Sequence, residues 1–160
     1  VHKKFKDKNL YESLSAYGVG FHRHISEIDQ ELKIITKKKI NFIFTPHLTP
    51  MFRGILSTIY IESKNEKSIY DIYRELINFY KGKKFIIIKK INSMLSTNNV
   101  INTNNIQISV CKTKFKNKFI ILSAIDNLIK GGAGQAVQNM NIKFDFKINE
   151  GLKWKKYFSY

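Results

Sequence analysis

The chain has 160 residues, of which 43% are hydrophobic, and its formal net charge is +16. This length suits one domain with a genuine core and is short for a complete two-domain enzyme. No apolar run approaches the roughly 18 residues of a membrane span, and no signal-peptide pattern opens the chain. The single cysteine, Cys111, excludes an internal disulfide and fits a reducing cytoplasm.

The basic residues are almost all lysines: only three of the 28 are arginines. A pI near 9.9 is typical of proteins that bind nucleic acids. The lysines, however, are spread over several predicted elements, with runs at residues 3–8, 37–39 and 112–118. This scatter favours a solvated lysine coat over a nucleic-acid or membrane partner, and a basic nucleic-acid binder stays an alternative.

Along the first third of the chain, residues 15–20 predict a strand that ends in a glycine-rich turn. A helix from about Ser26 to Ile35 follows, because Ile28, Leu32 and Ile35 recur at helical spacing behind a serine that can cap them.

Two β-rich segments, residues 40–45 and 55–62, predict strands joined by a loop over residues 46–54. The loop contains both prolines of the chain, so it can hold side chains in fixed positions. Ser68 then caps a predicted helix that runs to about Tyr80.

In the second half, residues 85–89, 106–111 and 119–125 predict three strands, the last two forming a hairpin across Lys116 and Asn117. Strands joined mostly by hairpins and segregated from a few helices predict an α+β fold, a mostly antiparallel sheet with helices on one face. A closing strand or docked tail is expected from the spacing of Phe144, Phe146, Leu152 and Trp154.

The segment from Ser123 to Asn141 predicts one helix, although it contains three of the eight glycines. Each glycine inside a helix costs roughly 0.5–1 kcal/mol relative to alanine, so the cluster needs a reason. The pattern alone leaves two reasons open: tight packing between helices, or close approach by a ligand. The apolar residues at helical spacing are Ile125, Leu128, Ile129, Ala133, Ala136, Val137 and Met140.

Three motifs together resemble the N-acetyl-γ-glutamyl-phosphate reductase family, the NADP-dependent enzymes of arginine biosynthesis. They are Gly20 to Ile28 (GFHRHISEI), Phe44 to Leu56 (FTPHLTPMFRGIL) and the glycine-containing segment from Ser123 to Asn141. They agree in order and spacing with the carboxy-terminal part of the family. This resemblance implies a fold like the carboxy-terminal domain of glyceraldehyde-3-phosphate dehydrogenase and a cytoplasmic homo-oligomer.

The resemblance also implies how the chemistry is divided. Family members attack the acyl phosphate with a cysteine and reduce the thioester with hydride from NADPH. Cys111 does not match the family's nucleophile, and nothing in the chain matches the dinucleotide-binding half. We therefore expect a chain that is inactive alone, with residues 1–122 as a substrate-binding and dimerisation domain. Residues 123–160 are expected to pack on the absent NADP-binding domain.

Four residues of the motifs are candidates for the substrate site. By resemblance His22 is the catalytic acid–base group, since a histidine exchanges protons near neutral pH. Arg23, His24 and Arg53 are candidates for binding the anionic substrate, because guanidinium pairs with carboxylate and phosphate groups. A structural ion pair, such as Arg23 with Glu27, is the alternative for each arginine.

For the cofactor, the resemblance assigns Gly131, Gly132 and Gln135 to the surface that faces the nicotinamide end of NADP. No metal site is expected. Besides the reductase, an interaction module or catalytic remnant that lacks its nucleotide-binding half stays open.

Overall fold

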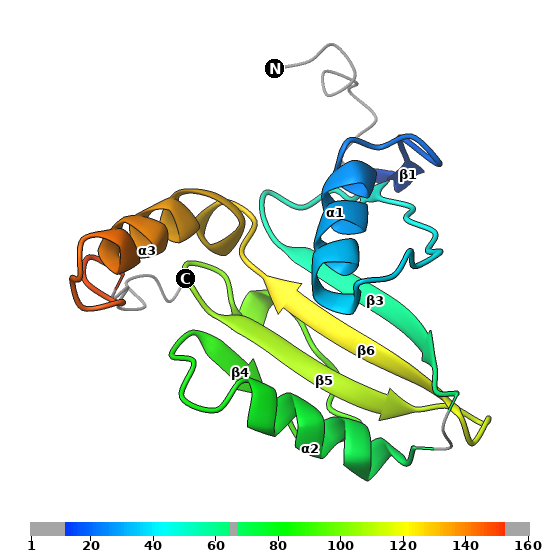
Figure 1. Ribbon diagram of the computed structural model, residues 1–160. Helices are drawn as coiled ribbons and strands as arrows, with labels where there is room; N and C mark the ends of the chain where they lie inside the picture. Colours follow the sequence, from blue (N-terminus) through cyan, green and yellow to red (C-terminus); the bar gives the residue numbers. More distant parts are fainter. Residues whose placement is uncertain (1–11, 65–66, 153–160) are drawn as a thin grey trace. The chain divides into compact units, whose positions relative to one another are not determined.

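The computed structural model describes residues 12–64 and 67–152, which are drawn in colour in Figure 1. The chain divides into two compact units, Val1–Phe52 and Arg53–Tyr160, and each is described by itself. In the described residues, no helix is long and apolar enough to cross a membrane.

The first unit combines a small two-stranded sheet with one helix. Strand β1 (Ser15–Ala16) pairs antiparallel with β2 (His47–Leu48). Helix α1 spans His24–Thr36 and ends at Lys37, which has a left-handed φ of 56°. The helix confirms the sequence prediction but begins two residues before Ser26. Ser26 does not cap it, because its hydroxyl donates to the carbonyl of Arg23.

The strand predicted over residues 40–45 is wrong. These residues have no regular structure, and within the described chain no strand pairs with them. β-branched side chains favour an extended backbone, but a strand needs a hydrogen-bonding partner as well.

The second unit is built on a four-stranded sheet in the order β3-β6-β5-β4. Strands β3 (Ile55–Glu62), β6 (Lys118–Ile125) and β5 (Ile106–Lys112) are antiparallel neighbours. The edge strand β4 (Ile86–Ile88) runs parallel to β5. A 3₁₀ turn at Thr97–Asn99 lies in the irregular segment between β4 and β5.

Helix α2 (Ile69–Phe79) covers one face of this sheet. Ser68 and Asp71 form a capping box, in which the Ser68 hydroxyl accepts from the Asp71 amide and the Asp71 carboxylate accepts from the Ser68 amide. The core under the helix is formed by Ile69, Val110 and Phe119, all buried. The α+β fold and the mostly antiparallel sheet are therefore confirmed.

The opposite face of the sheet is less covered along the edge strand β3. The β3–β6 register puts Leu56 and Tyr60 on the same face as Leu122 and Ile120, away from the core residue Phe119. Leu56 is 47% exposed and Tyr60 is 77% exposed. This face is therefore an apolar surface that α2 does not cover.

The helix predicted from Ser123 to Asn141 is wrong at its start. Ser123 lies inside β6, which continues to Ile125 because each of its residues pairs with β3. A turn follows at Ile129–Ala133, in which the backbone of Gly132 is not helical (φ −148°, ψ −114°), and α3 begins only at Gly134 (Gly134–Lys143). The predicted boundary at residue 122 falls within β6, and the division of roles at that point stays a prediction.

The predicted closing strand is not found in the described residues after α3. Phe144 and Phe146 are exposed, whereas Leu152 is buried. Trp154 lies outside the described residues, as do the lysines of residues 3–8.

Candidate active site

His22 stands in the turn that leads from β1 into α1, and aromatic rings surround it. The ring centroids of His24, Tyr17 and Phe44 lie 4.7, 5.3 and 5.5 Å from that of His22, all in edge-to-face geometry. The amide of His24 donates a hydrogen bond to Nδ1 of His22 at 3.2 Å. The imidazole is therefore held on several sides.

A shallow, open hollow of about 510 Å³ lies beside this histidine. Two cationic residues, Arg23 and Lys39, line it together with the carboxylate of Asp29. The described residues contain no ion pair between Arg23 and Glu27. The first unit thus gathers His22 and Arg23 at one hollow that could admit an anion, with His24 against the His22 ring.

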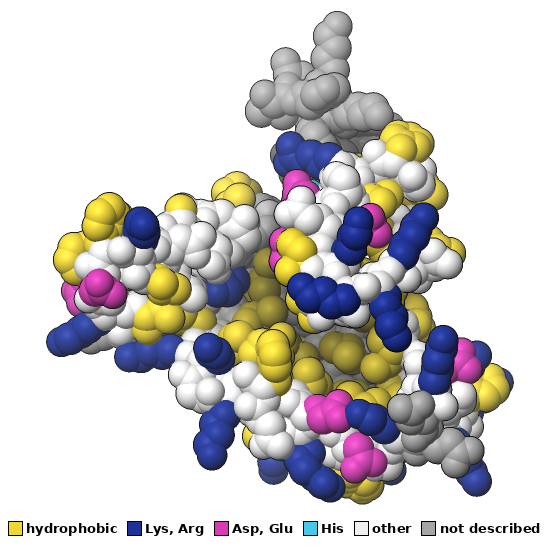
Figure 2. Space-filling view, in the orientation of Figure 1, with side chains coloured by type: hydrophobic (Ala, Val, Ile, Leu, Met, Phe, Trp, Pro, Cys, Tyr) yellow, Lys and Arg dark blue, Asp and Glu magenta, His cyan; other side chains and the backbone are white. Residues whose placement is uncertain are grey.

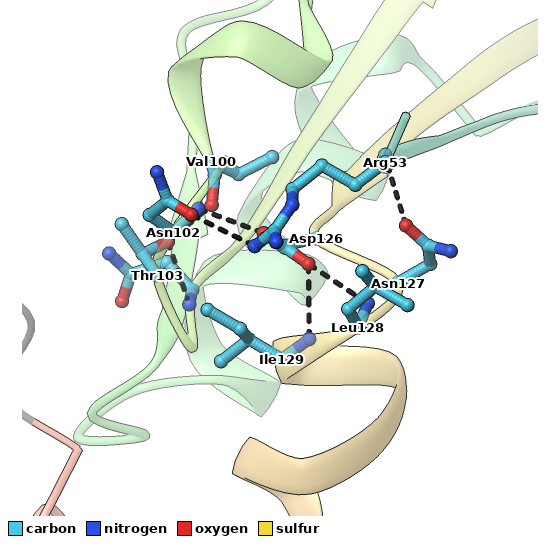
Figure 3. A network of polar contacts seen from close by, with 10 residues as sticks. Arg53, Val100, Asn102, Thr103, Asp126, Asn127, Leu128 and Ile129 are labelled. Atoms are coloured by element: carbon cyan, nitrogen blue, oxygen red, sulfur yellow. Dashed lines mark hydrogen bonds and ion pairs between the residues drawn. The ribbon is translucent and has the colours of Figure 1, made fainter. Parts of the chain in front are cut away.

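Arg53 lies in the second unit, within a network of polar contacts shown in Figure 3. Its Nη1 atom donates to Oδ1 of Asn102 at 2.9 Å and lies 3.3 Å from Oδ2 of Asp126. The next residue, Gly54, donates its amide to Oδ1 of Asn127 at 2.6 Å. Arg53 therefore has the structural ion pair that the alternative reading expected, and its substrate role stays a prediction.

Asp126 is the centre of this network, and its side chain is fully buried. Its Oδ1 accepts from the amides of Leu128 and Ile129, and its Oδ2 accepts from the amide of Asn102 and from Arg53. Burial raises the pKa of this carboxyl, but these hydrogen bonds outweigh burial and hold the pKa below its ordinary value. Sequence reasoning missed Asp126, because its partner Arg53 is far away in the chain.

The glycine-containing segment separates into two environments. Gly131 and Gly132 are exposed, and a Cβ at either would approach no atom closer than 3.5 Å. Gly134 is buried, and a Cβ there would lie 2.5 Å from Oδ1 of Asn104. Close packing within the chain therefore explains Gly134, whereas it does not explain the other two glycines.

The third candidate for the cofactor, Gln135, is half-buried, and its amide donates to Oδ1 of Asn139. Nearby, Oε1 of Gln138 accepts from both Lys130 and Asn104 at 2.9 Å. Burial lowers the pKa of Lys130, whose ammonium also lies over the ring of Phe85. This second polar cluster was not predicted from the sequence.

Cys111 lies in β5 and is only 7% exposed. Its nearest polar contacts are the hydroxyl of Ser109 at 3.9 Å and the carbonyl of Ser93 at 4.0 Å. The structural role predicted for this thiol agrees with its burial. Within residues 12–64 and 67–152, no group of His, Cys, Asp and Glu side chains could hold a metal ion.

The predicted site residues thus fall in both units. His22, Arg23 and His24 belong to the first unit, and Arg53 and the glycine-containing segment belong to the second.

The chain matches the family described as semialdehyde dehydrogenase, dimerisation domain, over residues 1–127. It is 42% identical over 144 residues to the N-acetyl-gamma-glutamyl-phosphate reductase of Staphylococcus aureus (strain MRSA252), covering 90% of this chain and 42% of the relative. It is 45% identical over 148 residues to the enzyme of the same name from Clostridium botulinum (strain Alaska E43 / Type E3), covering 92% of this chain and 42% of the relative. The chain thus spans less than half the length of these relatives.

Two solved structures share the fold. An aspartate semialdehyde dehydrogenase from Francisella tularensis matches with a TM-score of 0.60 at 18% identity, over 74% of this chain and 34% of that chain. Aspartate semialdehyde dehydrogenase II from Vibrio cholerae matches with a TM-score of 0.60 at 15% identity, and the match covers 80% of this chain and 38% of that chain. Because the family match covers most of its length, the chain belongs to the semialdehyde dehydrogenase dimerisation-domain family.

Proposed function

We propose that the chain is part of an NADPH-dependent reductase that converts N-acetyl-γ-glutamyl phosphate to N-acetylglutamate semialdehyde in arginine biosynthesis, in the cytoplasm. The observation that carries the proposal is the identity of 41–45% to reductases of that name over about 90% of this chain. The described chain supports it with a histidine that is held firmly at a cation-lined hollow.

The chemistry is divided between this chain and the rest of the enzyme. Cys111 is buried in a strand, so the thiolate that attacks the acyl phosphate and releases phosphate comes from outside this chain. His22 then serves the oxygen of the thioester, which becomes negatively charged as hydride adds to the carbonyl carbon. The resulting thiohemiacetal collapses to the aldehyde, and its C–S bond breaks to release the cysteine thiolate. Arg23, His24 and Arg53 bind the negative groups of the substrate, because a guanidinium group pairs well with carboxylate and phosphate groups.

NADPH supplies the hydride when it is bound. On this chain Gly131, Gly132 and Gln135 would hold it, and the first two fit such a role because they are exposed and no contact within the chain requires glycine there. Small residues let another group approach the backbone closely.

A second copy of the chain is the partner that we propose for the uncovered sheet face. The family is described as a dimerisation domain, and the exposed Leu56 and Tyr60 give this face the apolar character that subunit interfaces require.

The face shown in Figure 2 does not favour a nucleic-acid binder. Figure 2 shows Lys and Arg side chains scattered over this face of the molecule, not gathered in one patch.

A reconstitution experiment distinguishes the reductase from the interaction module. The chain is mixed with a separately expressed amino-terminal half of the Clostridium botulinum relative, and NADPH oxidation is followed with the acyl phosphate. The reductase predicts activity only in the mixture, whereas binding without turnover would support an interaction module.

A further inference from the structure

The chain bends at Gly132, between the turn at Ile129–Ala133 and α3 (Figure 1). Gly132 has φ −148° and ψ −114°, whereas Gly134, where α3 begins, has helical angles of −66° and −35°. Before the bend, the amide of Gly131 ties the turn to the end of β6 by donating to the carbonyl of Asp126 at 3.0 Å. The direction of α3 therefore depends on the contacts that are made across the bend.

A hydrogen bond between two side chains crosses this bend. Nζ of Lys130, before the bend, donates to Oε1 of Gln138, inside α3, at 2.9 Å. Gln138 lies four residues beyond Gly134, which is about 6 Å along the helix axis. A contact at that distance has a longer lever arm than the backbone bonds at the bend, so it fixes the direction of α3 more tightly.

Asn104 binds the same oxygen of Gln138 from the side of the sheet. Its Nδ2 donates to Oε1 at 2.9 Å, and together with Lys130 it uses both lone pairs of that oxygen. Asn104 is only 1% exposed, and among the described residues its Oδ1 has no hydrogen-bond partner. This Oδ1 lies against Gly134, where a Cβ would be 2.5 Å away. The start of α3 is thus held against the segment that leads into β5.

The surroundings of Lys130 are costly for a charged group. The side chain is half-buried, and its ammonium lies 5.5 Å from the ring centroid of Phe85, which is 7% exposed. Within residues 12–64 and 67–152, Lys130 forms no ion pair with a carboxylate. An apolar side chain would fill this place without removing a charge from water. Stability alone therefore does not account for the lysine, whereas a need for a directed charged donor at the bend does.

We infer that Lys130 is a positioning residue, which fixes the bend at Gly132 through its hydrogen bond to Gln138. The bend sets the course of the exposed backbone at Gly131 and Gly132, to which we assign the nicotinamide end of NADPH. Lys130 acts through this backbone and needs no contact with the cofactor. The inference rests on the proposed function where it concerns NADPH, but the role of Lys130 at the bend does not.

The role at the bend is tested on the whole chain by residual dipolar couplings of the backbone amides. These couplings report the direction of α3 relative to β5 and β6. Lys130→Met keeps the apolar stem and removes the donor, so the couplings of α3 should change while those of the sheet stay the same. Lys130→Arg keeps a charged donor and should stay close to the unaltered chain. Lys143→Met, at the exposed end of α3, is the matched control. Unchanged couplings in Lys130→Met would overturn the inference.

Two further measurements do not depend on the folding of Lys130→Met. In ¹H–¹⁵N NMR of the unaltered chain, the ammonium of Lys130 should exchange its protons with water more slowly than that of the exposed Lys143. Gln138→Glu keeps an oxygen that accepts from both donors and should preserve the direction of α3, whereas Gln138→Leu should change it. Equally fast exchange of the two ammonium groups, or equal couplings in the two Gln138 variants, would refute the hydrogen bond across the bend.

The effect on the cofactor is measured in the reconstituted enzyme by fluorescence titration with NADPH. The dissociation constant should rise by about tenfold or more in Lys130→Met, because a hydrogen bond to a charged group is worth about that factor. Lys130→Arg should restore most of the affinity. Equal affinity in Lys130→Met and Lys143→Met would contradict the positioning role. If the couplings change as expected and the unaltered mixture binds no NADPH, the proposed function fails while the role of Lys130 at the bend stands.

Discussion

Nη1 of Arg53 lies 3.3 Å from Oδ2 of Asp126, and this contact joins the start of β3 to the turn after β6. The Asp126 carboxylate also binds the amides of Asn102, Leu128 and Ile129. One buried carboxylate thus fixes the point at which the chain leaves the sheet for the glycine-containing segment.

Replacing Asp126 should destabilise the second unit. Asp126→Asn removes one acceptor oxygen and the charge that faces Arg53, so the free energy of unfolding should fall by about 2–4 kcal/mol. Asp145→Asn is the matched control, because Asp145 is exposed and the change there should stay within about 0.5 kcal/mol. Urea unfolding measures both. Equal stabilities of the two variants would show that the network contributes little.

The same carboxylate predicts an acid dependence of stability. The pKa of Asp126 is lower in the folded chain than its ordinary value of 3.8. The contribution of this carboxylate to the free energy of unfolding is therefore complete above pH 3.8, and it is lost as the pH falls through the folded pKa. Unfolding measured from neutral pH to below pH 3.8 should show a smaller loss on acidification in Asp126→Asn than in the unaltered chain. Asp71, whose pKa is lowered by hydrogen bonds from Ser68, contributes in the same direction in both proteins. Parallel curves would contradict the prediction.

Alanine substitutions at two glycines should distinguish a glycine needed for packing within the chain from one that contacts a ligand. Gly134→Ala puts a methyl group 2.5 Å from Oδ1 of Asn104 and 2.6 Å from Cγ2 of Ile129, which should cost about 1–3 kcal/mol of stability. Gly131→Ala meets no atom closer than 3.6 Å and should leave stability unchanged or higher. In the reconstituted enzyme, Gly131→Ala should nevertheless weaken NADPH binding, measured by fluorescence titration. Unchanged affinity would remove Gly131 from the cofactor surface.

How much of this could be predicted from the sequence depends on whether the determining contacts are local. The α2 start was predicted from Ser68, because a capping box operates within four residues. The helix expected from Ser123 failed because pairing with β3 extends β6 to Ile125, a contact between distant segments. The spacing of Ile125, Leu128 and Ile129 mimics a helical face although a strand end and a turn produce it.

The candidate site shows the same limit. The resemblance in its motif directed attention to His22, and the aromatic cluster around it comes partly from neighbours in sequence. The contact between Arg53 and Asp126 spans 73 residues, and no local pattern indicates that a carboxylate will be buried there. The buried Asn104, whose Oδ1 has no hydrogen-bond partner, was likewise beyond prediction.

The uncovered sheet face should mediate self-association. Tyr60→Glu puts a charge on that face, so the association constant of the dimer, measured by sedimentation velocity, should fall by about tenfold or more. A tenfold fall corresponds to about 1.4 kcal/mol of association free energy. Tyr70→Glu is the control, because Tyr70 is 60% exposed on α2, away from that face. A dimer that tolerates Tyr60→Glu as well as Tyr70→Glu would place the interface elsewhere.

The most direct test of the central claim is the rate of NADPH oxidation by the reconstituted enzyme when His22 is replaced. Because His22 is proposed to serve the reacting oxygen, His22→Ala should lower the rate by about 10²–10⁴-fold. His47→Ala, in the exposed β2 position, and Cys111→Ser, in the buried strand, should leave the rate nearly unchanged. A full rate in His22→Ala, or loss of the reaction in Cys111→Ser, would contradict the assignment of the chemistry proposed for this chain.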